Sequence, residues 1–184
     1  QIENCGLPVV CCYPPNSEGV MDFYELAAEI FGGEIAEKCN ELIDTYYDAL
    51  TIYDGYKPLE NVKVLAIWSM SNGLYRLQGN TAETIECIKR TGATLCYDEP
   101  EYVEVDMEAV AAYDADIIIN FRTKQVADEE LLKNSVFTST RAYQEGNFYT
   151  VMVDYAGQAP STFPTIIMLM YWVCSTLYGE DYTG

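Results

Sequence analysis

The sequence predicts an α/β fold with a mostly parallel sheet, preceded by one long helix. Short apolar runs typical of buried strands recur at residues 62–68, 115–121 and 148–153, and helical patterns separate them. A single helical pattern also extends over residues 34–54. Parallel strands need long crossover connections, so this alternation favours a sheet that is covered by helices. Apolar residues make up 49% of the 184 residues, which is enough for a sizeable core.

The first part of the chain predicts a strand, a helix and then the long helix. Residues 7–13 (LPVVCCY) form an apolar run that stops at two prolines, as expected of a buried strand. Apolar residues at helical spacing follow between Phe23 and Phe31, and the glycine pair at 32–33 predicts the end of that helix. The long helix at 34–54 has about 20 residues and a length of about 30 Å. The first 60 residues offer the strand at 7–13 no partner, so we expect its sheet neighbours to lie upstream of the given sequence.

The second part of the chain adds shorter elements between the three strands. A polar loop at 69–80 leads to a helix at 81–90, and Asp106 predicts the N-cap of a brief helix. The other predicted elements are a short strand at 95–97, a helix at 128–133 and a closing helix at 163–178. The closing helix contains the most apolar stretch of the chain. At about 13 residues this stretch is shorter than the roughly 20 that a membrane span needs, which indicates a buried helix.

The composition excludes several kinds of function. The chain has 10 basic and 29 acidic residues, a net charge of −19 and no histidine. It therefore supplies no Ser-His-Asp triad, no Cys-His pair and no histidine ligand for zinc or haem iron. The negative charge repels nucleic-acid phosphates and anionic membrane surfaces. A binding domain, or an enzyme that works through Asp, Glu, Tyr or Cys, remains.

Seven cysteines lie along the chain without a C-x-x-C spacing. They are Cys5, Cys11, Cys12, Cys39, Cys87, Cys96 and Cys174. A zinc ribbon or an iron–sulfur site is not indicated, and we expect no bound metal. The cysteines fit two interpretations: buried small apolar side chains or, in an exported protein, disulfides with at least one thiol left free.

Polar residues that follow the predicted strands are candidates for ligand binding. In open α/β sheets, ligands bind beyond the carboxyl ends of the strands. The candidates are Tyr75, Arg76, Gln78, Arg122 and Tyr155. A guanidinium group suits a carboxylate or phosphate on a ligand. The alternative interpretation is that these residues belong to an ordinary solvated surface.

The order of several short motifs along the chain is more specific than any one of them. The motifs are Cys5–Val10 (CGLPVV), Glu25–Gly33 (ELAAEIFGG), Val62–Leu65 (VKVL), Thr91–Ala93 (TGA), Val105–Glu108 (VDME), Ala115–Ile119 (ADIII) and Ala142–Tyr149 (AYQEGNFY). The long helix stands between the second and the third motif. This arrangement resembles the second half of the ABC-importer substrate-binding proteins that take up iron siderophores, haem and cobalamin. The resemblance covers nearly the whole chain.

The resemblance implies a division of the chain. Residues 1–33 would be the last strand and helix of an N-terminal lobe, and residues 34–55 would be a long interlobe helix. Residues 61–184 would form a three-layer, Rossmann-like C-terminal lobe that binds ligand. A stiff interlobe helix implies only slight closure of the two lobes around a ligand.

Two further features of the resembling family have counterparts here. A carboxylate on each lobe docks on arginines of the permease, and Glu129, Glu130 and Glu145 are the candidates for it in this chain. Some cobalamin-binding members have a disulfide that ties the region after the glycine-ended helix to the last helix. This resemblance implies a disulfide between Cys96 and Cys174.

We therefore expect the C-terminal part of a non-catalytic solute-binding component of an ABC importer. Its ligand would be a metal chelate: a ferric siderophore, haem or a cobalamin. It would be a monomer in the periplasm, or a lipoprotein anchored at the cell surface, and would have an ABC permease as partner and no resident cofactor. Two alternatives remain open. One is a nitrogenase-like or other chelate-handling enzyme lobe that uses Cys5, Cys11 and Cys12, and the other is an acidic interaction module without a small ligand.

Overall fold

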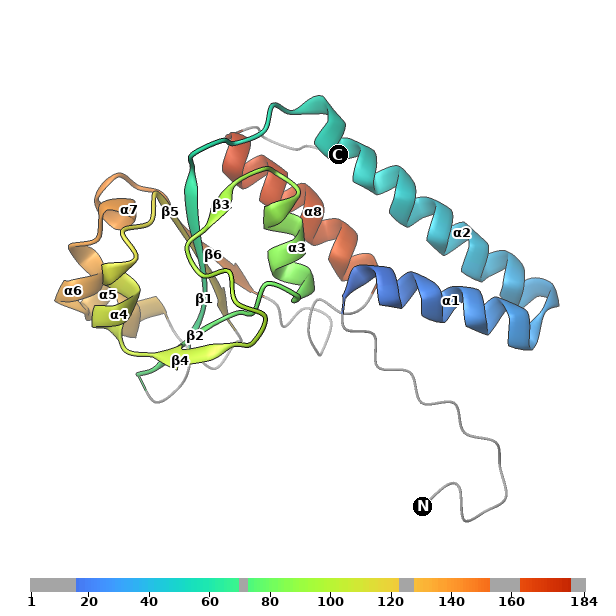
Figure 1. The fold of residues 1–184 in the computed structure, drawn as a ribbon, viewed down its shortest axis with the longest axis horizontal. Coiled ribbons are helices and arrows are strands. Elements are labelled where there is room, and N and C mark those ends of the chain that lie inside the picture. Colours follow the sequence, from blue (N-terminus) through green and yellow to red (C-terminus); the bar gives the residue numbers. More distant parts are fainter. Residues whose placement is uncertain (1–15, 70–72, 123–127, 153–162, 180–184) are drawn as a thin grey trace, which may run out of the picture.

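A computed structural model describes residues 16–69, 73–122, 128–152 and 163–179 (Figure 1). The helices are α1 Ser17–Phe31, α2 Gly33–Leu50, α3 Glu83–Lys89, α4 Met107–Ala112, α5 Asp128–Lys133, α6 Ser135–Thr138, α7 Arg141–Gln144 and α8 Phe163–Tyr178, with the 3-10 helix η2 at Thr51–Gly55. The strands are β1 Lys63–Ser69, β2 Tyr75–Leu77, β3 Thr94–Leu95, β4 Val103–Val105, β5 Ile117–Arg122 and β6 Phe148–Met152. The strand predicted at 7–13 lies outside the described residues.

The described strands form one mixed sheet in the order β4-β2-β1-β5-β6, with β3 paired to β1. The pairs β1–β5, β5–β6 and β1–β3 are parallel, which confirms the mostly parallel sheet. The pairs β1–β2 and β2–β4 are antiparallel. The prediction of a continuous loop at 69–80 is therefore wrong at residues 75–77. A strand of three residues is too short to produce a recognisable period of two.

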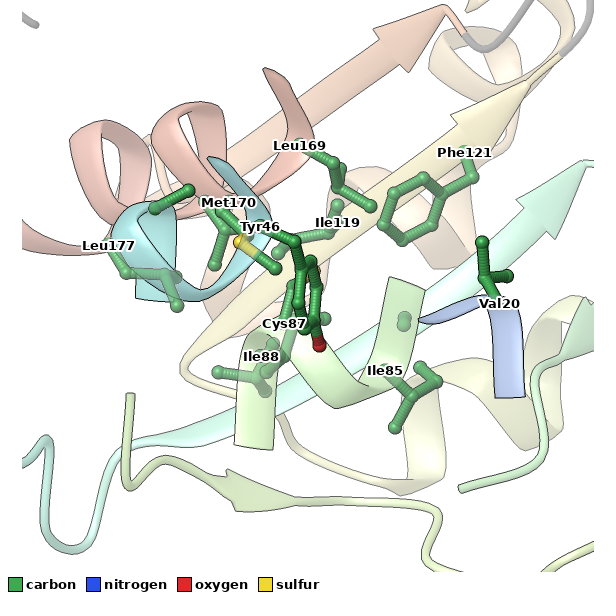
Figure 2. Close-up of a cluster of buried hydrophobic side chains, with 14 of the residues drawn as sticks. Val20, Tyr46, Ile85, Cys87, Ile88, Ile119, Phe121, Leu169, Met170 and Leu177 are labelled. Carbon is green, nitrogen blue, oxygen red and sulfur yellow. The ribbon is translucent and has the colours of Figure 1, made fainter. Parts of the chain in front are cut away.

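Helices cover both faces of the sheet, because alternate strand residues point to opposite sides. On β1, Val64 and Ala66 belong to a first buried cluster, whereas Leu65 and Ile67 belong to a second. The first cluster is completed by residues of α1, α2, α3, β5 and α8. Figure 2 shows the ring of Tyr46, from α2, among side chains of this cluster. The second cluster contains residues from α4, α5, α6 and α7. The predicted three-layer architecture is confirmed.

The helices α1 and α2 form a hairpin that projects away from the sheet (Figure 1). They join at Gly32, which has a φ of 62° and donates its N–H to the carbonyl oxygen of Ala28 at 2.9 Å. A left-handed φ of this kind favours glycine, so the predicted helix end at 32–33 is confirmed. The long helix is shorter than predicted. Its α-helical part ends at Leu50 and continues as η2 to Gly55.

Candidate functional site

The carboxyl ends of three parallel strands lie at one edge of the sheet. In the register of the sheet, Trp68 of β1 is opposite Phe121 of β5, and Arg122 of β5 is opposite Met152 of β6. The strand β2 runs antiparallel and begins at this edge, with Tyr75 opposite Ser69. We call this end of the sheet the carboxyl edge. It is the position at which open α/β sheets bind ligands.

One row of cross-strand neighbours lies directly behind the carboxyl edge. In order across the sheet it consists of Glu104 of β4, Arg76 of β2, Trp68 of β1, Phe121 of β5 and Val151 of β6. Residues directly opposite each other share a face of the sheet. The rings of Trp68 and Phe121 are stacked, with centroids 6.4 Å apart and an interplanar angle of 25°. The row thus joins an aromatic pair to a charged pair on the face that α3 and α8 cover.

Arg76 occupies a defined position in this row. Its Nη2 lies 3.2 Å from Oε1 of Glu104, and its guanidinium carbon lies 4.2 Å from the centroid of the Tyr102 ring. Its Nε is buried and has no hydrogen-bond partner among the residues that the structure describes. Tyr102 is 56% exposed. Sequence reasoning identified Arg76 but missed Tyr102 and Glu104, because the pairing of β2 with β4 that brings them together has no local signal.

The structure places the other predicted ligand-binding residues differently. Tyr75 lies at the carboxyl edge, but its side chain is buried in the second cluster. Gln78 follows β2 and lies about 10 Å along the chain from Tyr75, away from this edge. Arg122 is the last residue of β5, so its backbone lies in the same outermost row of the sheet as Tyr75. Tyr155 lies outside the described residues.

The three predicted docking carboxylates lie in two different places along the chain. Glu129 and Glu130 are on α5, which follows the carboxyl end of β5. Glu145 is exposed and directly follows α7, three residues before β6 begins. The main-chain carbonyl of Asn147, two residues further on, accepts from the N–H of Ile118 near the start of β5 at 3.0 Å. Glu145 therefore lies toward the amino edge of the sheet, and Figure 1 shows α7 at that end.

The disulfide between Cys96 and Cys174 is not present, which corrects the implication of the resemblance. Both thiols are free. Cys96 packs against the second cluster, and Cys174 is buried on α8, a helix of the first cluster. Cys96 thus packs on one face of the sheet, whereas the helix that carries Cys174 covers the other face. Cys39 and Cys87 are also buried and free, as the interpretation of small apolar side chains expects.

The opposite, amino edge of the sheet carries an ion cluster. Arg141 of α7 donates to the carboxylates of Asp114 and Asp116, and the distance from its Nε to Oδ1 of Asp114 is 3.0 Å. The N–H of Lys63 donates to Oδ2 of Asp116 at 2.7 Å. This backbone hydrogen bond, together with the guanidinium, holds the pKa of Asp116 below its ordinary value. The cluster ties α7 to the starts of β1 and β5, so we interpret it as structural.

Two negative findings apply to the residues that the structure describes. Among them, no three Cys, Asp or Glu side chains are grouped in a way that could hold a metal ion. Nor does any helix there combine the length and the hydrophobicity of a membrane span.

No protein-family model and no curated protein sequence matches the chain. Solved structures do match it. An ABC transporter substrate-binding protein from Listeria monocytogenes superimposes with a TM-score of 0.79 at 15% identity, over 97% of this chain and 70% of that one. The haem-binding protein HutB of Vibrio cholerae superimposes with a TM-score of 0.74 at 15% identity, over 96% of this chain and 70% of that one. For the vitamin B12-binding protein BtuF of the same organism the TM-score is 0.71 at 14% identity, and the match covers 99% of this chain and 69% of that one.

These neighbours are binding proteins by name, and this chain spans about 70% of the length of each. The match extends over α1, α2 and the sheet with its covering helices, because nearly the whole chain superimposes. The chain therefore has the fold of the substrate-binding proteins of ABC transporters.

Proposed function

We propose that this chain is the C-terminal part of an extracytoplasmic solute-binding protein of an ABC importer, and that it binds a metal chelate without catalysis. The chelate is a ferric siderophore, haem or a cobalamin. The observation that carries this proposal is the convergence of β1, β5 and β6 at the carboxyl edge, in a fold that superimposes on binding proteins for haem and vitamin B12. These neighbours support the proposal through their fold.

The chemistry of the carboxyl edge suits a bulky chelate. The backbone of Arg122, the last residue of β5, lies in the outermost row, and in this proposal its guanidinium supplies a cation to the ligand, in a chain with a net charge of −19. Trp68, one residue behind the edge, is half-buried, and it stacks on the ring of Phe121, which is fully buried in the first cluster. Such a combination offers a charge for carboxylates or other anionic groups and apolar area for a ligand ring system. In this proposal Arg122, Arg76 and Tyr155 contact the ligand. Tyr75 is buried in the second cluster, so in this proposal it supports the site through packing and does not contact the ligand.

The proposal includes the two-lobe organisation. Residues 1–33 belong to the preceding lobe, the helix from residue 34 to 55 joins the lobes, and residues 61–184 form the ligand-binding lobe. The hairpin of α1 and α2 supports this division, because it projects from the sheet instead of covering it along its whole length (Figure 1). Permease docking then falls to Glu129 or Glu130, since α5 follows the carboxyl end of β5, whereas Glu145 lies toward the opposite edge.

An acidic interaction module without a small ligand is the second candidate. The composition favours it, because the chain has 29 acidic residues and only 10 basic ones. Its binding would weaken with salt, and small ligands would leave its stability unchanged. The enzyme alternative depends on Cys5, Cys11 and Cys12, which lie outside the described residues.

The test is a thermal-unfolding screen of the full-length protein against ferric siderophores, haemin and cobalamins. A ligand at 100 times its dissociation constant adds about 2.7 kcal/mol to stability. For a ligand found in this way, Arg122→Gln should weaken binding about tenfold or more, because the substitution removes a charge-assisted hydrogen bond to the ligand. Lys57→Gln is the matched control, because Lys57 is exposed and precedes the amino end of β1. A folded protein that no member of the panel stabilises would contradict the proposal and favour the interaction module.

A further inference from the structure

Three side chains from β2, β4 and the residue before β4 are in contact directly behind the carboxyl edge. Arg76 of β2 and Glu104 of β4 are opposite each other in the antiparallel register, and Nη2 of Arg76 lies 3.2 Å from Oε1 of Glu104. Tyr102 comes two residues before Glu104, which is the spacing of neighbours on one face of a strand. Its ring centroid lies 4.2 Å from the guanidinium carbon of Arg76. We call Tyr102, Arg76 and Glu104 the Arg76 triad.

The contacts of the Arg76 triad contribute little to the stability of the fold. The side chains of Arg76 and Glu104 are 32% and 38% exposed, and a partly exposed ion pair adds little to stability. Tyr102 is 56% exposed and belongs to neither of the two buried clusters that the described residues form. Its ring lies over a guanidinium and not in the core. The contacts therefore restrict the position of Arg76 more than they stabilise the fold.

We infer that Tyr102 and Glu104 are positioning residues, which hold the guanidinium of Arg76 in place for the ligand. This inference rests on the proposed function, in which Arg76 contacts the chelate. An arginine side chain has many rotamers, and a ligand that must first immobilise it binds more weakly. Here the ring of Tyr102 supports the guanidinium from one side, and the carboxylate of Glu104 holds Nη2. The side chain is therefore ordered before the ligand binds.

The chemistry of Arg76 specifies the group of the ligand that it recognises. A guanidinium has several N–H donors and no acceptor, and the contact with Glu104 engages the donor Nη2. An oxygen atom at the periphery of the chelate, from a carboxylate, a catecholate or a hydroxamate, is a suitable partner for the other donors. In this role Tyr102 and Glu104 act through Arg76 and do not contact the ligand themselves.

The first measurement needs no ligand. Nitrogen NMR of the full-length protein follows the Nε–H of Arg76, which is buried, and Arg76→Lys identifies its signal by removing it. Tyr102→Ser and Glu104→Gln should each speed the exchange of this proton with water at least about tenfold, because the side chain then moves freely. Tyr102→Phe should change the rate less than about twofold, because phenylalanine keeps the ring under the guanidinium.

Glu60→Gln is the matched control for Glu104→Gln. It removes the same charge from an exposed residue that precedes the amino end of β1, so the exchange of the Arg76 proton should not change. Thermal unfolding of each variant shows that it is folded. Exchange in Tyr102→Ser that is as slow as in the wild type would overturn the inference.

The second measurement uses the chelate that stabilises the protein most among ferric siderophores, haemin and cobalamins. Tyr102→Ser and Glu104→Gln should each weaken its binding about fivefold, because the ligand then has to order the side chain of Arg76. In an Arg76→Gln background the same two substitutions should change the affinity less than about twofold, since residues that act through Arg76 have no effect without it. Tyr102→Phe should bind as the wild type does.

The two measurements separate this inference from the proposed function. Equal losses of affinity with and without Arg76 would overturn the positioning role of Tyr102 and Glu104, although the chelate binds. Faster proton exchange with an unchanged affinity would overturn it as well, because the contacts would then serve only the pairing of β2 with β4. If no chelate binds, the proposed function fails, and the exchange rates still decide whether Tyr102 and Glu104 hold Arg76 in place.

Discussion

The hydroxyl of Tyr53 donates a hydrogen bond of 3.2 Å to the main-chain carbonyl of Cys87. Tyr53 belongs to η2, which continues α2, and Cys87 belongs to α3, which covers the sheet. The bond therefore fastens the end of the long helix to the α/β lobe. Burial raises the pKa of Tyr53 well above its ordinary value, so its hydroxyl stays protonated and can donate at neutral pH.

Tyr53→Phe should lower the free energy of unfolding by about 1 kcal/mol, because it removes this hydrogen bond and leaves the Cys87 carbonyl without its donor. For a chain of this size the melting temperature should fall by about 2–4 °C. Urea unfolding measures the change. Tyr47→Phe on α2 is the control, because Tyr47 is 50% exposed and its loss should be close to neutral. Equal stability losses in both variants would contradict the fastening role of Tyr53.

The buried thiols should react slowly in the folded protein. Burial raises the pKa of Cys87 to about 12 and that of Cys174 to about 11. At pH 8 the thiolate of Cys87 is then about a thousandfold rarer than that of an unperturbed cysteine. We expect alkylation by iodoacetamide to spare both residues in the native state and to modify both in guanidinium chloride, as peptide mass spectrometry would show. Native labelling at the unfolded rate, or a disulfide at either residue, would argue against the packing of α3 on α8.

The ion cluster at the amino edge should make stability depend on acid pH. The pKa of Asp114 is lowered, mainly by its hydrogen bond from Arg141, and that of Asp116 is lowered mainly by the N–H of Lys63 and also by Arg141. A carboxylate whose pKa is lower in the folded state stabilises the fold above its unfolded pKa of about 4, and loses this contribution as the pH falls through the folded value. Arg141→Gln should therefore be less stable than the wild type at pH 7. The difference should shrink progressively below about pH 4.

Urea unfolding of both proteins between pH 7 and pH 2.5 measures that difference. Because the wild type and the variant share all other acidic residues, the comparison isolates the cluster from the general effect of protonating 29 carboxylates. A difference that stays constant with pH would show that Arg141 acts through packing and not through its charge.

Gly92 should tolerate alanine worse than a glycine with the same backbone conformation. Its φ is +78°, and an added Cβ would lie 2.8 Å from Cβ of Pro58. Gly146 has a φ of +79° but has open space around it. Gly146→Ala should cost about 1 kcal/mol, which reports the left-handed strain alone. Gly92→Ala should cost about 1–3 kcal/mol more, because the clash is added. Thermal unfolding of the two variants checks this, and identical losses would contradict the close approach to Pro58.

Much of the fold follows from local sequence patterns. The strands predicted at 62–68, 115–121 and 148–153 are confirmed as β1, β5 and β6, with ends that differ by one or two residues. The strands β1 and β5 are buried on both faces, which requires an unbroken apolar run that is visible in the sequence, whereas β6 stands at the end of the strand order and is half-buried. The cap at Asp106 is confirmed as well, since its carboxylate accepts from the N–H of Ala109 three residues further on. The closing helix α8 is confirmed over 163–178.

Pairing across the sheet was decided only by the tertiary structure. The strands β2 and β4 have three residues each. They form because β2 pairs with β1, and β4 pairs in turn with β2. The site shows the same limit: Arg76 was identified as a loop residue, but its partners Tyr102 and Glu104 are far away in the sequence. Likewise, the sides of the sheet that Cys96 and Cys174 occupy decide against their disulfide. The sequence by itself thus determined the elements whose periodicity is local, whereas register, partners and faces depend on contacts between distant residues, for which one sequence carries no local signal.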